Sequence, residues 1–296
     1  MHPRTFRADL LLLITAAIWG SAFVAQRLGM NAVGPMLYTG LRFTLGALAI
    51  LPLALLLKEG RPPRRPLSRR GLYLAGATAG VLLFLGASLQ QVGLLYTSVA
   101  NAGFITGLYV VLVPLIGLLL GQRPHAGIWL GAGLAITGLY LLSVGDGFTI
   151  ASGDALQLIG AVFWALHVLL LDAVARRTHA VRLACLQFAT CALLSMIAAV
   201  LFETIDLAAI RVAAPAIAYG GLLSVGLAYT LQVVAQKDAI ASHAAIILSM
   251  EAVFAALAGW LVLGETLTVR ALAGCTLMLA GMLAAQLIPL MRRTRS

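Results

Sequence analysis

Three ionisable side chains, Arg42, His167 and Glu251, lie inside long apolar stretches of this sequence. Placing a charged group at the centre of a lipid bilayer costs roughly 2.5–3.5 kcal/mol on insertion scales, so such residues are rare. Where they occur, they bind substrates, carry protons or form polar contacts between helices. These three residues are therefore the first candidates for a functional site.

Glu251 lies near the middle of the apolar stretch 242–263. With about 3.6 residues per helical turn, it shares a face with Ile247, Phe254 and Ala258. A carboxyl group there can exchange a proton or bind the ammonium group of a substrate. The structural alternative is a hydrogen bond to a neighbouring helix. We predict that Glu251 is a proton-coupling residue.

Arg42 lies in the apolar stretch 35–57. A guanidinium group donates two parallel hydrogen bonds to a carboxylate, which suits recognition of an amino acid. Two alternatives are a side chain that extends to the membrane surface and a permanent pair with a protein carboxylate. We predict that Arg42 binds substrate.

His167 follows Trp164 by three residues, so both side chains lie on one helix face. Histidine titrates near neutral pH, and tryptophan offers a flat apolar wall with one N–H donor. Trp19 occupies a similar place in the first apolar stretch. We predict that Trp19, Trp164 and His167 line a substrate cavity, with helix packing as the alternative for the tryptophans.

Uncharged polar side chains inside the apolar stretches extend this set. They are Gln90, Gln91, Asn101, Tyr229, Gln232 and Gln236. Each either faces a substrate or forms a hydrogen bond between helices, worth only ~0.6 kcal/mol on average. We predict that Gln91, Asn101, Tyr229 and Gln232 bind substrate.

The sequence has no catalytic or metal-binding motif. Its five histidines lie in separate segments without the spacing of metal ligands. It lacks an HExxH, a Gly-x-Ser-x-Gly and a Walker motif. The three cysteines, Cys185, Cys191 and Cys275, fall in apolar stretches and are typical of packing residues. We therefore expect no metal, no cofactor and no catalytic residue.

The composition is that of a membrane protein. Of 296 residues, 61% are hydrophobic and 10% are charged, and the mean hydropathy is +1.01. Soluble domains are about 45–50% apolar and about 25% charged, so a soluble enzyme is excluded. Because about 20 apolar residues cross a bilayer, the sequence predicts an all-α integral membrane protein with ten transmembrane helices. They lie at 9–28, 35–57, 72–94, 101–121, 126–145, 155–172, 183–203, 213–236, 242–263 and 268–290.

The basic residues are distributed unequally between the connections of these ten stretches. With the N-terminus inside, 16 of the 20 Lys and Arg residues fall in cytoplasmic segments. Only Arg27, Arg211 and Arg270 fall in outside loops. Cytoplasmic loops of membrane proteins collect such residues. The pattern predicts a multi-pass inner-membrane protein with both termini in the cytoplasm, and it explains the net charge of +10 without a nucleic-acid partner.

The two halves of the chain match each other. Shifted by 145 residues, Trp19 falls on Trp164 and Arg42 on the neutral Gln187. Shifted by 143, three glycines at 121, 131 and 138 fall on those at 264, 274 and 281. Each half has five stretches, so the halves enter the membrane from opposite sides. We predict two inverted-topology five-helix repeats, 1–145 and 146–296; the alternative is a duplication that merely enlarged a bundle.

These motifs resemble the ten-span EamA-type branch of the drug/metabolite transporter superfamily. The resembling segments are 19–23, 41–43, 114–121, 163–165, 251–257 and 259–265, with the glycines at 131 and 138. The resemblance implies a transporter that exports amino acids or other small metabolites, driven in some members by the proton gradient. Ala252 and Gln122 stand where the family often has Pro and Glu, which leaves the fold expectation intact.

We therefore predict a secondary transporter that exports small metabolites, amino acids foremost, by alternating access. Its expected partners are the lipid bilayer, a small-molecule substrate and, as candidate coupling ion, the proton. The chain acts as a monomer or a homodimer. A passive channel or facilitator is the alternative, and a membrane-embedded enzyme is less favoured because no catalytic motif is present.

Overall fold

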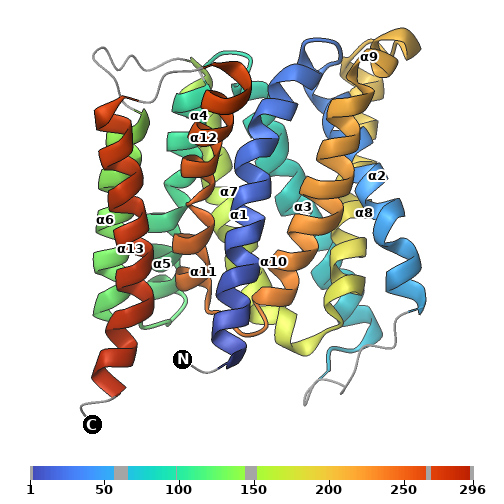
Figure 1. Ribbon diagram of the computed structural model, residues 1–296. Coiled ribbons are helices and arrows are strands. Elements are labelled where there is room, and N and C mark those ends of the chain that lie inside the picture. Colours follow the sequence, from blue (N-terminus) through green and yellow to red (C-terminus); the bar gives the residue numbers. More distant parts are fainter. Residues whose placement is uncertain (1–2, 57–65, 98, 144–151, 265–267, 294–296) are drawn as a thin grey trace.

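The computed structural model describes residues 3–56, 66–97, 99–143, 152–264 and 268–293, and within these ranges it contains helices and turns but no strand. Figure 1 shows a bundle of roughly parallel and antiparallel helices. Residues 57–65, which include four of the basic residues counted above, lie outside the described residues. So does Glu265 of the last family motif.

Seven long helices run without a break. They are α1 (Pro3–Met30), α2 (Pro35–Leu56), α3 (Arg69–Gly93), α6 (Ala126–Ser143), α7 (Ser152–Val174), α8 (Ala180–Phe202) and α13 (Val269–Arg293). A short turn of 3₁₀ helix, η1 (Ala175–Arg177), joins α7 to α8. Apolar side chains on all sides of these helices favour burial in lipid and in the bundle together.

Three of the ten expected spans consist of shorter helices instead of one continuous helix each. The first consists of α4 (Val99–Gly107) and α5 (Tyr109–Leu119). The second consists of α9 (Leu207–Ala218), a π-helix η2 (Tyr219–Tyr229) and α10 (Thr230–Ala235). The third consists of α11 (Ala241–Leu248) and α12 (Glu251–Leu263). Broken helices in a membrane protein usually border a cavity, where the freed backbone groups find partners.

Among the described residues, seven helical segments are long and apolar enough to cross a membrane. Three shorter apolar segments accompany them, at Ile105–Leu119, Ala126–Leu141 and Leu272–Ala285. The expected boundary near residue 213 is wrong, because α9 begins at Leu207. There the Asp206 side chain accepts a hydrogen bond from the Ala208 amide at 2.9 Å and caps the helix.

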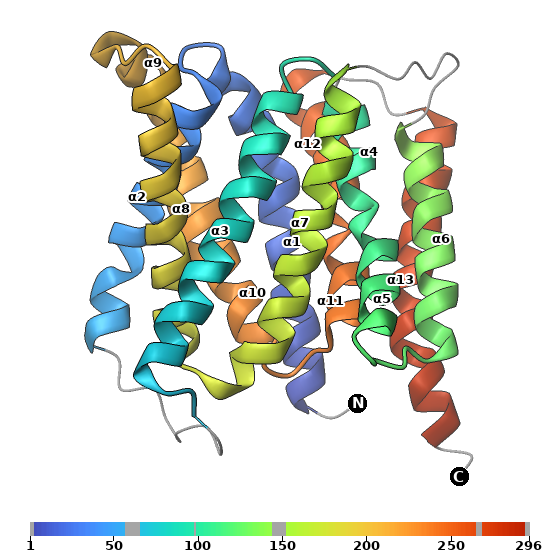
Figure 2. The same cartoon turned by 180° about the vertical axis from the view of Figure 1, so that it is seen from behind.

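The helices pack in pairs drawn from opposite halves of the chain. α6 lies against α13 at one edge of the bundle, and α2 lies against α8 near the other (Figures 1 and 2). α3 contacts both α7 and α8, and α1 contacts α12 and η2. The first turn of α1 and the last turn of α13 lie at the same end of the bundle (Figure 1).

Glycines allow the α6–α13 pair to approach closely. A Cβ atom added at Gly131 would lie 2.8 Å from the carbonyl oxygen of Gly281. One added at Gly138 would lie 2.5 Å from the carbonyl oxygen of Gly274. Such small-residue seams let backbones meet at distances that larger side chains forbid.

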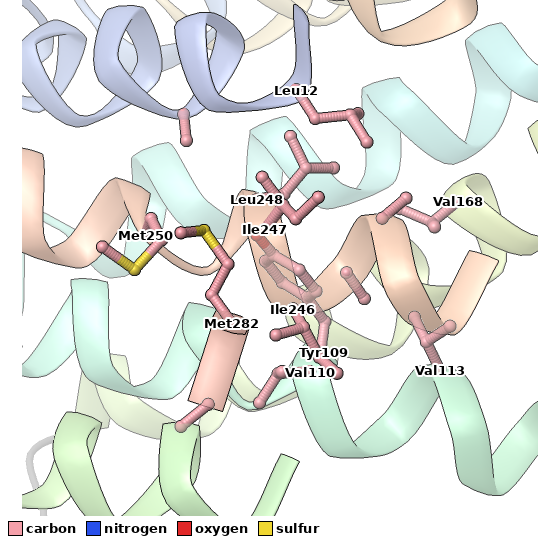
Figure 3. Close-up of a cluster of buried hydrophobic side chains, with 14 of the residues drawn as sticks. Leu12, Tyr109, Val110, Val113, Val168, Ile246, Ile247, Leu248, Met250 and Met282 are labelled. Atoms are coloured by element: carbon pink, nitrogen blue, oxygen red, sulfur yellow. The ribbon is translucent and has the colours of Figure 1, made fainter. Parts of the chain in front are cut away.

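Buried apolar clusters hold the bundle together. One joins Leu12 of α1, Tyr109 of α5, Val168 of α7 and Ile247 of α11, which Figure 3 shows packed around one another. Another surrounds Phe43, Phe188 and Tyr229. The polar residues described next lie between these two clusters, because Trp19 and Trp164 contact both.

Candidate functional site

A cavity with an empty volume of about 530 Å³ lies in the middle of the bundle, where the broken helices meet α1, α2, α3 and α7. Only a small part of it admits water-sized molecules, so side chains nearly fill it. The lining residues are Trp19, Phe23, Gln26, Arg42, Gln90, Thr106, Tyr109, Trp164, His167, Val168, Ser224, Tyr229, Gln232, Leu248 and Glu251.

Most of the site residues predicted from the sequence meet in this cavity. They are Trp19, Arg42, Trp164, His167, Tyr229, Gln232 and Glu251. Gln91 does not line it: the side chain is buried in α3, and both amide atoms lack a hydrogen-bond partner among the described residues. Asn101 lies in α4, but its side chain is outside the described part of the structure.

Arg42 places a buried positive charge at the cavity. Its residue is 3% exposed, and its guanidinium carbon lies 5.6 Å and 5.2 Å from the ring centres of Tyr38 and Phe43. Its Nε has no hydrogen-bond partner within the described ranges, and no carboxylate there forms an ion pair with it. A guanidinium without an anion is costly to bury, so Arg42 is a candidate for binding one.

Glu251 is the first residue of α12, directly after the break that follows α11. The hydroxyl of Tyr109 donates a hydrogen bond to its Oε1 at 3.1 Å. A carboxylate in the first turn of a helix is also stabilised by the positive end of the helix dipole. The break therefore turns Glu251 into the cavity and supplies part of the environment for its charge.

Aromatic rings form a wall around Tyr229 of η2. Its ring centre lies 4.4 Å from that of Trp19 and 6.3 Å from that of Trp164, the latter pair stacked. The indole Nε1 of Trp19 donates to the Ser224 carbonyl oxygen at 3.2 Å, and that of Trp164 donates to Gln90 Oε1 at 3.1 Å. Both tryptophans therefore face one cavity with their N–H groups fixed.

His167 is 1% exposed and lies edge-on to Trp164 and Tyr229. Its Nε2 is 2.9 Å from Oε1 of Gln187. Gln187 itself does not line the cavity, although its position corresponds to that of Arg42. The hydrogen bond fixes the imidazole ring and leaves one side of it toward the cavity.

A group of amides on one side of the cavity was not fully foreseen from the sequence. Gln157 Nε2 donates to the Gln90 carbonyl oxygen at 2.9 Å, and Thr106 Oγ1 donates to Gln157 Oε1 at 3.3 Å. Gln90 Nε2 in turn donates to Gln26 Oε1 at 3.4 Å. Tyr109 was not predicted either, because a tyrosine in an apolar stretch is typical of a packing residue. Its role follows from its hydrogen bond to Glu251.

Two buried carboxylates lie beyond the cavity, one toward each end of the bundle. Asp9 Oδ1 of α1 is 2.8 Å from Nε2 of His243, near the start of α11. Asp154 Oδ1 of α7 accepts a hydrogen bond from Thr97 Oγ1 at 2.5 Å, just before α4. Each joins the first helix of one half to the fourth helical segment of the other.

No group of three or more His, Cys, Asp or Glu side chains suited to a metal ion occurs in the ranges that the structure describes. The three cysteines there are free thiols in separate places. The polar groups of the cavity are instead one guanidinium, one carboxyl, one imidazole, several amides and aromatic N–H and O–H groups. This chemistry suits noncovalent recognition of a small polar molecule.

The profile of the EamA-like transporter family matches residues 6–144 and again residues 151–285. An uncharacterized transporter of Archaeoglobus fulgidus is 33% identical over 266 residues, which cover 88% of this chain and 80% of the relative. The threonine/homoserine exporter RhtA of Salmonella typhimurium is 31% identical over 287 residues, covering 92% and 88%.

Two further matches are a named transporter and a solved structure. The uncharacterized inner membrane transporter YedA of Escherichia coli is 29% identical over 153 residues, which cover 50% of this chain and 47% of YedA. A solved crystal structure aligns with 98% of this chain and 99% of its own, with a TM-score of 0.79 and 22% sequence identity. That likeness shows the fold alone.

Proposed function

The chain belongs to the EamA-like transporter family, and on that premise we propose that it is a secondary exporter of small zwitterionic amino acids. The observation that carries the proposal is a single cavity lined by both an unpaired guanidinium, Arg42, and a carboxyl group, Glu251. A free amino acid presents the complementary pair of charges. That its relative RhtA is named a threonine/homoserine exporter supports the same class of substrate.

Arg42 binds the substrate carboxylate, because its guanidinium offers two parallel N–H donors and has no protein anion to bind. Glu251 accepts hydrogen bonds from the ammonium group. Trp19, Trp164 and Tyr229 enclose the backbone of the substrate, while Gln232 and His167 face its side chain. The small free volume limits the substrate to one of modest size.

We propose ten membrane spans arranged as two inverted repeats, 1–145 and 146–296. The two matches of the family profile support this, one in each half. The breaks at Leu108 and at Ser249–Met250 each fall in the fourth helical segment of a half. The close approach of Gly131 to Gly281 also has its counterpart in that of Gly138 to Gly274, as a two-fold axis between α6 and α13 requires.

Alternating access follows from two such halves, since exchanging their conformations opens the cavity to opposite sides. The pairs Asp9–His243 and Asp154–Thr97 close the ends of the bundle in this scheme. Breaking one pair while keeping the other opens the cavity to one side of the membrane. We place both termini on the cytoplasmic side of the inner membrane, because the basic residues gather in the connections at that end.

Glu251 is also the proposed proton-coupling residue. It exchanges a proton with the cavity when substrate leaves, and the charged or titratable groups around it are Tyr109, Tyr229, His167 and Arg42. Transport by the Glu251→Gln variant is expected to lose most of its dependence on pH across a pH series. An unchanged pH profile in that variant would remove the proton role and leave substrate binding intact.

Counterflow in proteoliposomes tests the transport proposal. Liposomes loaded with unlabelled threonine or homoserine should accumulate the labelled amino acid transiently, because a carrier exchanges one molecule for another. A passive channel gives no such overshoot. Absence of counterflow for every small amino acid tried, with protein present in the membrane, would reject the proposed substrate class. Succinate as the loaded compound is the matched negative control, since it lacks an ammonium group.

A further inference from the structure

A second pocket lies apart from the central cavity, where α2 ends and where α3 and α8 begin. It has an empty volume of about 1240 Å³ and shares no lining residue with the central cavity. Figures 1 and 2 show that these helix ends lie at the end of the bundle that also holds the first turn of α1. Nothing in the proposed transport cycle uses this pocket.

Positive charge gathers in the second pocket. Arg69, Arg177 and Arg182 line it together with His179, and none of the described lining residues is acidic. Several positively charged groups around one pocket attract an anion. The fork of N–H donors on arginine matches the oxygens of a phosphate group. The pocket is therefore suited to a phosphate-bearing anion.

Contacts between the helices fix the shape of the second pocket. Arg182 Nε donates to the Ala54 carbonyl oxygen at 3.2 Å and joins α8 to α2. The Leu67 amide donates to the Arg177 carbonyl oxygen at 2.8 Å and ties η1 to the segment before α3. The Arg69 guanidinium lies 5.9 Å from the ring centre of Tyr73. These contacts join the segments that border the pocket.

Apolar side chains also line the second pocket. Leu51 and Leu55 of α2 and Leu72 of α3 line it, and Leu55 is 70% exposed. A free phosphate ion makes no use of such side chains. A molecule with an anionic head and a hydrocarbon tail uses both kinds of lining, and basic pockets between membrane helices on the cytoplasmic side bind such lipids.

We propose that the second pocket binds an anionic phospholipid. The phosphate of its headgroup lies among Arg69, Arg177 and Arg182, and an acyl chain lies along Leu51 and Leu55. The bound lipid bridges α2, α3 and α8, three helices that also pack on one another. Its place in the inner leaflet rests on the proposed orientation, whereas lipid binding itself does not.

Intact-complex mass spectrometry of the purified full-length protein in detergent tests this proposal. The protein is titrated with phosphatidylglycerol or with zwitterionic phosphatidylcholine. Phosphatidylglycerol should bind more tightly. The variant Arg69→Gln/Arg177→Gln should weaken its binding by about fivefold for each arginine removed. This variant keeps Arg182 and its bond between α8 and α2, so the fold is retained.

The matched control is Arg211→Gln/Arg270→Gln, which removes the same charge at the opposite end of the bundle and should leave phosphatidylglycerol binding unchanged. Leu55→Ser, at an exposed position, should weaken phosphatidylglycerol binding without altering the far-ultraviolet spectrum. Equal affinity for both lipids, or unchanged binding in the Arg69→Gln/Arg177→Gln variant, overturns the proposal. Displacement of the lipid by inorganic phosphate alone also overturns it and indicates a site for a soluble anion.

Discussion

Asp9 in α1 and Asp154 in α7 occupy corresponding positions in the two halves of the chain, 145 residues apart, and lie toward opposite ends of the bundle. Both are buried, and each joins the first helix of its half to the fourth helical segment of the other. Their partners differ: Asp9 pairs with the imidazole of His243, whereas Asp154 accepts from the hydroxyl of Thr97. The two aspartates thus occupy corresponding positions, but the side chains that they contact are chemically different.

The same contrast holds at the cavity. Arg42 of the first half corresponds to Gln187 of the second, and only Arg42 lines the cavity. Glu251 follows the helix break in the second half, while the break in the first half is followed by Tyr109, its hydrogen-bond donor. The helix breaks therefore correspond in the two halves, but the charged side chains at the cavity do not, and under the proposed function this difference gives a zwitterion one orientation there.

The largest effect is expected from exchanging the charge between the halves. Arg42→Gln should raise the half-saturating concentration of a transported amino acid by about 10- to 100-fold, the loss of a charge-assisted hydrogen bond pair. Adding Gln187→Arg should not restore transport, since Gln187 bonds to His167 and does not line the cavity. Restored transport in the double variant would show that the halves are interchangeable. Transport kinetics in proteoliposomes give the measurement, with Arg211→Gln as control.

A smaller effect is expected at the carboxyl site. Tyr109→Phe removes one hydrogen bond to Glu251 and should weaken substrate binding by about 2- to 10-fold. Glu251→Gln keeps an oxygen that can accept from Tyr109 but removes the charge, and should weaken substrate binding by more. Competition assays with labelled substrate measure both. Equal losses in the two variants would mean that Tyr109, rather than the charge of Glu251, is the group that matters.

The end contacts should shift the equilibrium between the two open states in opposite directions. Asp9→Asn should favour opening at one end and Asp154→Asn opening at the other, each by about 3- to 10-fold, the value of one hydrogen bond. A cysteine introduced at Ser224 in the cavity, with the native cysteines replaced, reports access by labelling from each side. Shifts in the same direction for both variants would contradict the assignment of one contact to each end.

The last effect is on stability rather than on transport, at the seam between α6 and α13. Gly138→Ala places a Cβ 2.5 Å from the Gly274 carbonyl oxygen and should destabilise the protein by about 1–3 kcal/mol. Gly133→Ala, on the same helix with nothing within 4 Å of the added Cβ, should cause no loss. Thermal unfolding in detergent compares the two. If both variants were equally stable, the α6–α13 contact would be looser than the structure has it.

The fold class and much of the site could be predicted because they depend on composition and on rare residues. Long apolar stretches predict membrane helices directly, and a buried arginine or glutamate stands out in a chain with so few charges. Because the chain has only four tryptophans, the spacing of Trp19 and Trp164 predicts that both lie at the same site. Both face the cavity.

Other features could not be predicted because they depend on partners far away in the chain. Glu251 and Tyr109 are 142 residues apart, and only the folded arrangement brings them together. Gln90 and Gln91 are neighbours of the same residue type, so the sequence does not distinguish them. The rotation between consecutive residues of a helix turns the Gln91 side chain away from the cavity. The break at Ser249–Met250 contains neither glycine nor proline, so the local sequence does not predict it.

The pairing of α6 with α13 also constrains how the protein is made. α6 ends at Ser143, but its partner is the final described helix, completed only when residue 293 has been synthesised. Until then, the face of α6 that carries Gly131 and Gly138 has only lipid or other helices to meet. A chain that ends before residue 269 therefore lacks the helix that covers the Gly131 and Gly138 face of α6.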